Sequence, residues 1–244
     1  MNTDILKFAR MIDDANYIVF FGGAGVSTES GIPDFRSADG LYYQQREIPP
    51  ETILSHSFFI RQPELFYQFY KEKLLAPTAR PNPAHIALAA LEQEGRLRCV
   101  VTQNIDGLHQ MAGSSKVVEL HGSVHRNYCM RCRKAHSLDE VMDAEGPPRC
   151  ACGGLVRPDV VLYEEGLDPK VTQAAVKHIQ AADLLIIGGT SLSVYPAAYY
   201  AQLSRGAMVI INRDPTQLDG QADLVIRNPI GDTLKRVMEA RKPA

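Results

Sequence analysis

The sequence lacks the features that would place it in a membrane, on nucleic acid or among repeat proteins. No apolar run approaches the roughly 20 residues that a helix needs to cross a bilayer. Lys and Arg number 26 against 28 Asp and Glu, and the net charge of -2 gives no reason to expect a dedicated nucleic-acid binder. Internal repeats and low-complexity segments are absent. The start of the chain, Met1–Ile5, lacks the basic and apolar parts of a signal peptide, so we expect a cytoplasmic protein.

The composition is that of a globular protein with a well-buried core. Of its 244 residues, 45% are hydrophobic and 22% are charged, which excludes a disordered or collagen-like chain. This length suits one large domain or two small ones. Four of the five cysteines fall between positions 129 and 152, and in a reducing compartment such clustering indicates metal binding rather than disulfides.

Short apolar runs alternate with helical patterns along most of the chain. The runs are Tyr17–Phe21, Cys99–Thr102, Leu184–Ile187, Met208–Ile211 and Asp223–Ile226. Because they are apolar at nearly every position, we expect strands buried on both faces, in a parallel sheet covered by helices. Helices are predicted near the start of the chain, from Pro83 to about Gly95, and from Pro169. The alternation predicts a doubly wound α/β fold.

Two segments interrupt this alternation. Residues 37 to about 77 are rich in aromatics and helical in period, and residues 123 to about 157 carry the cysteine cluster. We interpret both as insertions that form a small module beside the sheet. The whole chain, residues 1–244, is then expected to be a single domain.

A glycine-rich turn follows the first predicted strand. In Gly22–Thr28 the glycines would let the backbone approach a pyrophosphate closely, although a tight structural turn would also explain them. The continuation, Glu29–Arg36, brings an Asp, a Phe and an Arg beside this turn and suggests a lid over a bound nucleotide. In the alternative interpretation, Phe35 belongs to the core and Arg36 is a surface charge.

Polar residues and a histidine follow two further predicted strands. Ligands of open α/β sheets collect at the carboxyl ends of strands, where Gln103, Asn104 and Asp106 could bind ribose hydroxyls or an amide. A turn that caps a helix would explain the same segment. His121 follows the apolar pair Val117–Val118 and suits general-base chemistry near neutral pH, but one histidine among seven could equally be structural.

The cysteine spacing predicts a structural zinc site. Cys129 and Cys132 form one pair, and Cys150 and Cys152 form a second, tighter pair after 17 intervening residues. Four thiolates fill the tetrahedral coordination of Zn²⁺ and leave no position for a catalytic water. The remaining Cys99 lies in a predicted buried strand and is expected to be inert.

Taken together and in order, these motifs resemble the sirtuin family of NAD-dependent protein-lysine deacylases, in its small bacterial or archaeal form. The resemblance runs from about Gly22 to about Asp232. The matching segments are Gly23–Ser27, Gly31–Arg36, Thr102–Asp106, His121–Gly122, the cysteine pairs, Arg157–Val161, Gly189–Leu192 and Asn212.

The resemblance implies a Rossmann-like large part, a small zinc-binding module, and a cleft between them for NAD and an acetylated protein or peptide. It assigns NAD contacts to Ala24, Thr28, Phe35, Arg36, Gln103, Asn104, Ile105, Asp106, Thr190, Ser191, Asn212 and Ile230. It gives His121 the role of base, and it places the substrate along Val160, Val161 and Tyr163. The reaction would consume NAD and give free lysine, nicotinamide and O-acetyl-ADP-ribose, and the protein is expected to be a monomer.

The resemblance also bears on which acyl group is removed. Family members that remove succinyl and malonyl groups carry a Tyr-x-x-Arg pair that binds the acyl carboxylate. The corresponding segment here is Phe66–Tyr70, in which Tyr67 matches the Tyr and Tyr70 stands in place of the Arg. A carboxylate without its ion partner would be costly to desolvate, so we expect acetyl or other neutral acyl groups.

Two other classes of function remain open at this point. A mono-ADP-ribosyltransferase would use the same NAD site without a lysine tunnel. A non-enzymatic zinc-ribbon module could use Arg126, Arg131, Arg133 and Lys134 on nucleic acid, although the chain as a whole is slightly acidic. Release of nicotinamide only in the presence of acetylated peptide would distinguish the deacylase from both.

Overall fold

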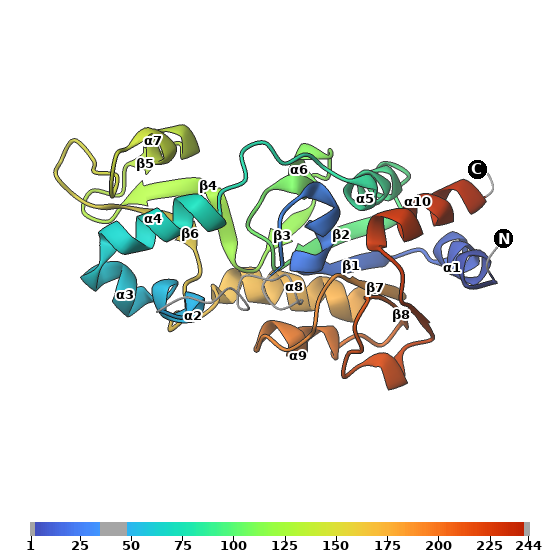
Figure 1. The fold of residues 1–244 in the computed structure, drawn as a ribbon. Coiled ribbons are helices and arrows are strands. Elements are labelled where there is room, and N and C mark those ends of the chain that lie inside the picture. Colours follow the sequence, from blue (N-terminus) through green and yellow to red (C-terminus); the bar gives the residue numbers. More distant parts are fainter. Residues whose placement is uncertain (1–2, 35–47, 242–244) are drawn as a thin grey trace.

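A six-stranded parallel sheet forms the larger part of the molecule in the computed structural model, which describes residues 3–34 and 48–241 (Figure 1). The strand order is β3-β2-β1-β7-β8-β9, and every neighbouring pair is parallel. The strands are β1 (Ile18–Gly22), β2 (Leu97–Thr102), β3 (Val117–Glu119), β7 (Leu184–Gly188), β8 (Ala207–Ile211) and β9 (Leu224–Ile226). The predicted apolar runs are therefore confirmed as strands, with ends that differ by one or two residues.

Helices cover both faces of this sheet. On one face lie α1 (Thr3–Asp14), α5 (Pro83–Gln93) and α10 (Ile230–Ala240), and on the other lie α8 (Pro169–Ala181) and α9 (Ala197–Ala201). Successive residues of β1 face opposite layers, since Ile18 and Phe20 belong to the first core and Val19 and Phe21 to the second. This arrangement is the predicted doubly wound, Rossmann-like α/β fold.

The ends of the predicted helices follow from local chemistry. Pro83 occupies the first turn of α5, and Asn82 before it accepts a hydrogen bond from the N–H of Ala84. Gly95 follows the end of this helix with φ of 75°, the left-handed conformation that glycine adopts most readily. Shorter helical turns are η1 (Ala24–Val26), η2 (Thr28–Ser30), α6 (Leu108–Met111) and η4 (Asp219–Gln221).

A second, antiparallel sheet and four helices form what we call the small module. The sheet has the order β5-β4-β6, and β6 lies at its edge. Its strands are β4 (Gly122–Cys129), β5 (Ala135–His136) and β6 (Val156–Val160), and its helices are α2 (Pro50–Ile53), α3 (His56–Arg61), α4 (Pro63–Lys73) and α7 (Leu138–Asp143). The helices α2–α4 come from the first segment that interrupts the α/β alternation, of which residues 37–47 lie outside the described residues.

The small module has its own core, separate from those of the large sheet. Aromatic rings from α3 and α4 pack edge to face and stacked, with centroids 4.8 Å apart for Phe59 and Phe66 and 5.5 Å apart for Phe66 and Tyr70. Figure 1 shows this module at one end of the molecule and the parallel sheet with α1 and α10 at the other. Each end therefore has a core of its own.

An ion pair reinforces each part. In the small module, Arg157 donates to both carboxylate oxygens of Glu165, at 2.8 and 3.0 Å. Burial would raise the pKa of Glu165, but hydrogen bonds from Arg157, the Leu162 N–H and His56 outweigh it and hold that pKa at about 2. Beside the large sheet, Arg241 donates at 2.7 Å to a carboxylate of α1 and, also at 2.7 Å, to Glu94 beyond the end of α5.

Candidate active site

A cavity of about 880 Å³ opens where the large sheet meets the small module. Its walls come from the loops that follow β1, β2, β7 and β8 and from the segment that follows β6. From β1 the chain continues to β2 on one side, whereas from the neighbouring β7 it continues to β8 on the other side. Such a switch point leaves a crevice at the carboxyl ends of the strands, where open α/β sheets bind their ligands.

The glycine-rich turn packs directly on the loop after β7. The N–H of Gly25 donates to the carbonyl of Gly189 at 2.8 Å. A Cβ on Gly189 would lie 2.3 Å from the backbone nitrogen of Val26, and its φ of 57° also favours glycine. The glycines therefore allow two loops to meet at the cavity, rather than only closing a tight turn. Ala24 and Thr28 line the cavity from this turn.

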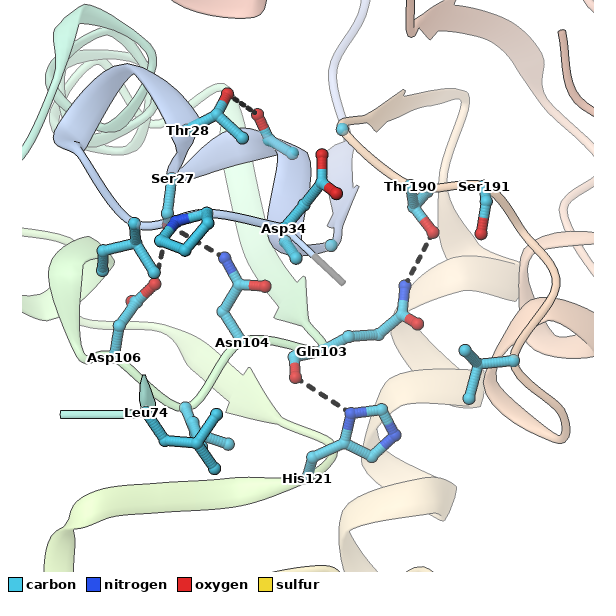
Figure 2. Close-up of a pocket in the computed structure, with 18 of the residues that line it drawn as sticks. Ser27, Thr28, Asp34, Leu74, Gln103, Asn104, Asp106, His121, Thr190 and Ser191 are labelled. Carbon is cyan, nitrogen blue, oxygen red and sulfur yellow. Dashed lines mark hydrogen bonds between the residues drawn. The ribbon is translucent and has the colours of Figure 1, made fainter. Parts of the chain in front are cut away.

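The polar segment after β2 joins the glycine-rich turn through side-chain hydrogen bonds (Figure 2). Ser27 donates to Asp106 at 2.6 Å, and Asn104 donates to the Ser27 hydroxyl at 3.0 Å. The other oxygen of the Asp106 carboxylate accepts the N–H of Leu108 at 3.0 Å. Gln103 donates to the Thr190 hydroxyl at 3.1 Å, across the cavity floor. The segment thus forms a turn that bonds to the first residue of α6, close to the alternative interpretation, and it also lines the cavity.

His121 stands at the cavity with one ring nitrogen committed. Its Nδ1 lies 2.9 Å from the carbonyl oxygen of Gln103, and since a carbonyl only accepts, Nδ1 carries the proton. In the neutral ring Nε2 then has a free lone pair, which a general base requires. Burial lowers the pKa of His121, although the hydrogen bond to Gln103 acts in the opposite direction. The imidazole is thus held neutral and fixed in one tautomer.

The segment after β6 forms the far wall of the cavity. Val160, Val161 and Tyr163 all line it. Part of this backbone is already paired within the chain: the N–H of Val161 donates to the carbonyl of His121 at 2.9 Å, and Tyr163 exchanges hydrogen bonds with Leu54 and His56. Glu164 has a φ of 76°, rare for a side chain larger than hydrogen. Its carboxylate accepts from the N–H and hydroxyl of Ser57, both at 2.9 Å.

The remaining predicted NAD contacts within the described residues also line the cavity, from the loops after β2, β7, β8 and β9. These are Ile105, Thr190, Ser191, Asn212 and Ile230. Phe35 and Arg36 lie outside the described residues.

The four predicted cysteine ligands converge at one point in the small module. All four sulfur atoms lie within 4.8 Å of one another, with 3.5 Å between Cys129 and Cys152 and 3.6 Å between Cys132 and Cys150. Tetrahedral zinc with Zn–S bonds of about 2.3 Å needs sulfur atoms about 3.8 Å apart, so the geometry fits. The pKa of the Cys150 thiol is lowered to about 6, mainly by a hydrogen bond from the backbone N–H of Cys152. This favours the thiolate that zinc requires.

The two tyrosines of α4 that match the acyl-selectivity segment lie away from the cavity. Neither Tyr67 nor Tyr70 lines the cavity, since their side chains are 1% and 0% exposed in the aromatic core of the small module. The Tyr67 hydroxyl donates to the carbonyl of Val156 at 2.6 Å. The residues of this region that do reach the cavity are Lys73 and Leu74. The helix turns its tyrosine face towards the core, which a short sequence match could not show.

Sequence reasoning also missed several residues that shape the cavity. Leu54 and Leu74 provide apolar wall beside Ile105, and Figure 2 shows Leu74 below Asp106. Nothing in the sequence marks them as cavity residues, because an apolar residue at the end of a helix resembles any core residue. Ser27 had a signal, since it lies in the glycine-rich motif, but its bond to Asp106 depends on a loop distant in sequence.

Comparisons with known proteins agree with this geometry. A sequence model described as the Sir2 family matches residues 23–196. An "NAD-dependent protein deacetylase" of Clostridium perfringens is 55% identical over 246 residues, covering 98% of this chain and all of that protein. An "NAD-dependent protein deacylase 2" of Pyrobaculum aerophilum is 42% identical, covering 97% and 96% of the two chains.

Solved structures extend the likeness to the whole fold. A Sir2 structure with a deacetylated p53 peptide and 3'-O-acetyl-ADP-ribose matches with a TM-score of 0.89 and 38% identity, over 97% of this chain and 98% of that one. A Sir2 complex with a p53 peptide and NAD+ matches with a TM-score of 0.86 over 98% of both chains, also at 38% identity. The class that the fold and cavity define is that of the Rossmann-like NAD enzymes with a small zinc module. Within that class, the chain belongs to the Sir2 family.

Proposed function

We propose that this chain is an NAD-dependent protein-lysine deacetylase. The observation that carries the proposal is the convergence on one cavity of the glycine-rich turn, the Gln103–Asp106 segment, His121 and the segment after β6. Family membership and relatives named as NAD-dependent protein deacetylases support it. NAD supplies the ADP-ribose that accepts the acetyl group, and the products are free lysine, nicotinamide and O-acetyl-ADP-ribose.

The cavity walls divide into regions that suit the parts of NAD. Backbone N–H groups of the glycine-rich turn, with Ala24 and Thr28, would hold the pyrophosphate. Gln103 would contact the ribose next to the nicotinamide, while Asn104, Ile105 and Asp106 would form the nicotinamide pocket. The adenosine half would lie against Thr190, Ser191, Asn212 and Ile230, and Phe35 and Arg36 would belong to the first loop.

His121 would act as the general base. The acetyl oxygen of the substrate would first attack C1′ of the ribose and displace nicotinamide. The free Nε2 of His121 can then take the proton of the 2′-hydroxyl, whose oxygen attacks the former carbonyl carbon, and addition of water releases the free lysine. The bond from Nδ1–H to the Gln103 carbonyl keeps the lone pair on Nε2 and orients the ring. Burial keeps the ring neutral near pH 7, so the base is available without a second carboxylate partner.

The acetylated peptide would run along the segment after β6. Because β6 is an edge strand, an extended peptide can add to it or to its continuation. Val161 and Tyr163 already pair within the chain, whereas the backbones of Gly166 and Leu167 bond to no other described residue. We therefore expect main-chain pairing from Glu164 onwards, with Val160, Val161 and Tyr163 lining the entrance for the acetyl-lysine side chain.

Several broader features complete the proposal. Zinc would hold the small module through Cys129, Cys132, Cys150 and Cys152 and take no part in the chemistry. Residues 1–244 would form one catalytic domain that acts as a monomer in the cytoplasm. The absence of disulfides among the described cysteines is consistent with a reducing compartment. No helix within residues 3–34 and 48–241 has the length and apolar character of a membrane span.

The test is nicotinamide release by the purified protein with NAD, in the presence and absence of an acetylated peptide. We expect release that depends on the peptide and matches the deacetylated lysine one to one. Release that does not require peptide, with ADP-ribose attached to protein, would indicate the ADP-ribosyltransferase instead. No release with NAD under either condition would contradict an enzymatic role.

A further inference from the structure

The loop that carries Asp106 is held from two sides. On one side it bonds to the glycine-rich turn through Ser27. On the other it bonds to strand β4 of the small module: the N–H of Val124 donates to the carbonyl of Ile105 at 3.0 Å, and Nε2 of His125 lies 3.0 Å from the carbonyl of Asp106. Because the carbonyl only accepts, Nε2 of His125 is the donor.

The ring of His125 also covers the next residue of the loop. Gly107 has a φ of 72°, and a Cβ built on it would lie 2.7 Å from both Cδ2 and Nε2 of His125. The ring therefore packs against the bare backbone of Gly107 while it bonds to Asp106. These two contacts fix the peptide unit between Asp106 and Gly107 from outside the cavity.

An irregularity in β4 aims this side chain at the loop. The pairing of β4 with β6 is regular at Gly122 and Ser123 and again from Asn127, with a register shift between Ser123 and Asn127. Irregularities of this kind re-aim side chains near functional sites. The same strand ends at Cys129, one of the four sulfur atoms of the cysteine cluster.

We propose that His125 is a positioning residue for the reaction: it couples the zinc-bearing strand to the nicotinamide loop and so fixes the orientation of Asp106. The proposal rests on the assignment of the Gln103–Asp106 segment to nicotinamide. His125 itself does not line the cavity and touches no reacting atom. Its loss should weaken interactions with nicotinamide and leave those with the peptide unchanged.

The test compares two replacements that separate the donor from the ring. His125→Phe keeps an aromatic ring over Gly107 but cannot donate, whereas His125→Gln can donate through its amide. We expect His125→Phe to raise both the KM for NAD and the nicotinamide concentration for half-inhibition by about three- to tenfold, the range of one ordinary hydrogen bond. The peptide KM should stay within twofold, and His125→Gln should stay within twofold of wild type throughout. Unchanged constants in His125→Phe, or an equal rise in peptide KM, would overturn the proposal.

A double-mutant cycle checks the packing contact. Gly107→Ala should reduce kcat/KM for NAD more in the wild-type background than in His125→Ala, where the ring that the new methyl group meets is gone. If the effects of the two substitutions on kcat/KM are additive, the ring of His125 does not contact Gly107.

Amide hydrogen exchange of residues 103–108 tests the coupling without requiring activity. Faster exchange is expected in His125→Phe than in His125→Gln, at equal zinc content and Tm. Equal exchange in the two variants would reject the coupling even if the wild type proved to have no deacetylase activity. Lack of peptide-dependent nicotinamide release in the wild type would instead reject the proposed function.

Discussion

The large sheet and the small module reach stability by different means. The sheet buries apolar side chains on both faces, with every residue of β1 and β7 buried. The small module has a two-residue strand, short helices and a single aromatic core, and it adds four converging thiols and the Arg157–Glu165 pair. A small core supplies little free energy, so metals and ion pairs take a larger share. We therefore expect the large sheet to tolerate the loss of any one interaction, whereas the small module depends on a few specific groups.

Zinc removal should produce the largest difference in stability between the small module and the large sheet. We expect a chelator, or Cys129→Ser, to unfold the small module and abolish deacetylation, because zinc binding contributes folding free energy directly. The sheet should persist, as seen by its far-UV circular dichroism and a second, later thermal transition. Zinc content and activity measured in parallel should fall together. A fully active protein with far less than one zinc per chain would contradict the structural site.

His121→Ala should remove the chemistry without disturbing either part. Loss of a general base typically costs on the order of 10²–10⁴ in rate. We expect kcat to fall by that range while Tm, zinc content and the dissociation constants of NAD and peptide change little. Single-turnover assays with calorimetric binding data provide the measurement. Turnover at the wild-type rate would show that another group acts as base.

Glu165→Ala should weaken the small module selectively. It leaves Arg157, whose side chain is 10% exposed, without its carboxylate, and breaking such a pair costs about 3–5 kcal/mol. Arg241→Ala is the matched change in the large part, where the abandoned carboxylates are more exposed, so a smaller cost is expected. Thermal unfolding of both variants, followed with one probe in the small module and one in the large sheet, tests this difference in stability. A larger loss in Arg241→Ala would reverse the comparison.

Acyl selectivity tests what α4 contributes to the cavity. We expect kcat/KM for an acetyl-lysine peptide to exceed that for the matching succinyl-lysine peptide by at least about tenfold, because a carboxylate beside Leu54, Leu74 and Ile105 would be poorly solvated. Lys73 lines the cavity, and its ammonium lies 2.9 Å from Glu72, which offsets its charge. A succinyl value equal to the acetyl value, lost in Lys73→Leu, would show that Lys73 binds acyl carboxylates.

The pH profile provides the smallest expected effect. Burial lowers the pKa of His121, and the neutral ring is the active form, so activity is lost only as pH falls through this lowered pKa. We expect kcat/KM to stay level from pH 8 down to about 6.5, the ordinary pKa of imidazole, and to decline below it. A decline that begins above pH 7 would mean that His121 is charged more readily than its surroundings suggest.

The sequence was most informative where a single physical pattern determines structure. Uninterrupted apolar runs predicted the strands of the large sheet, and four spaced cysteines predicted one metal site. It was least informative on α4, where Tyr67 and Tyr70 lie three residues apart and share a buried face. Contacts between distant segments, such as Ser27 with Asp106 or His125 with Gly107, left no local pattern. The first depends on how two loops of the large sheet meet, and the second on how the small module docks against those loops.

The central position of β1 affects how the chain folds during synthesis. Ile18 pairs with Leu97 on one side and with Leu184 on the other, so the middle of the sheet joins the two halves of the sequence. At ribosomal rates of roughly 5–20 residues per second, β1 would wait about 10 to 30 s for its second neighbour to emerge. During that interval, one apolar edge of the nascent sheet has no permanent partner. We expect chaperones that bind exposed strands to act on this chain before β7 emerges.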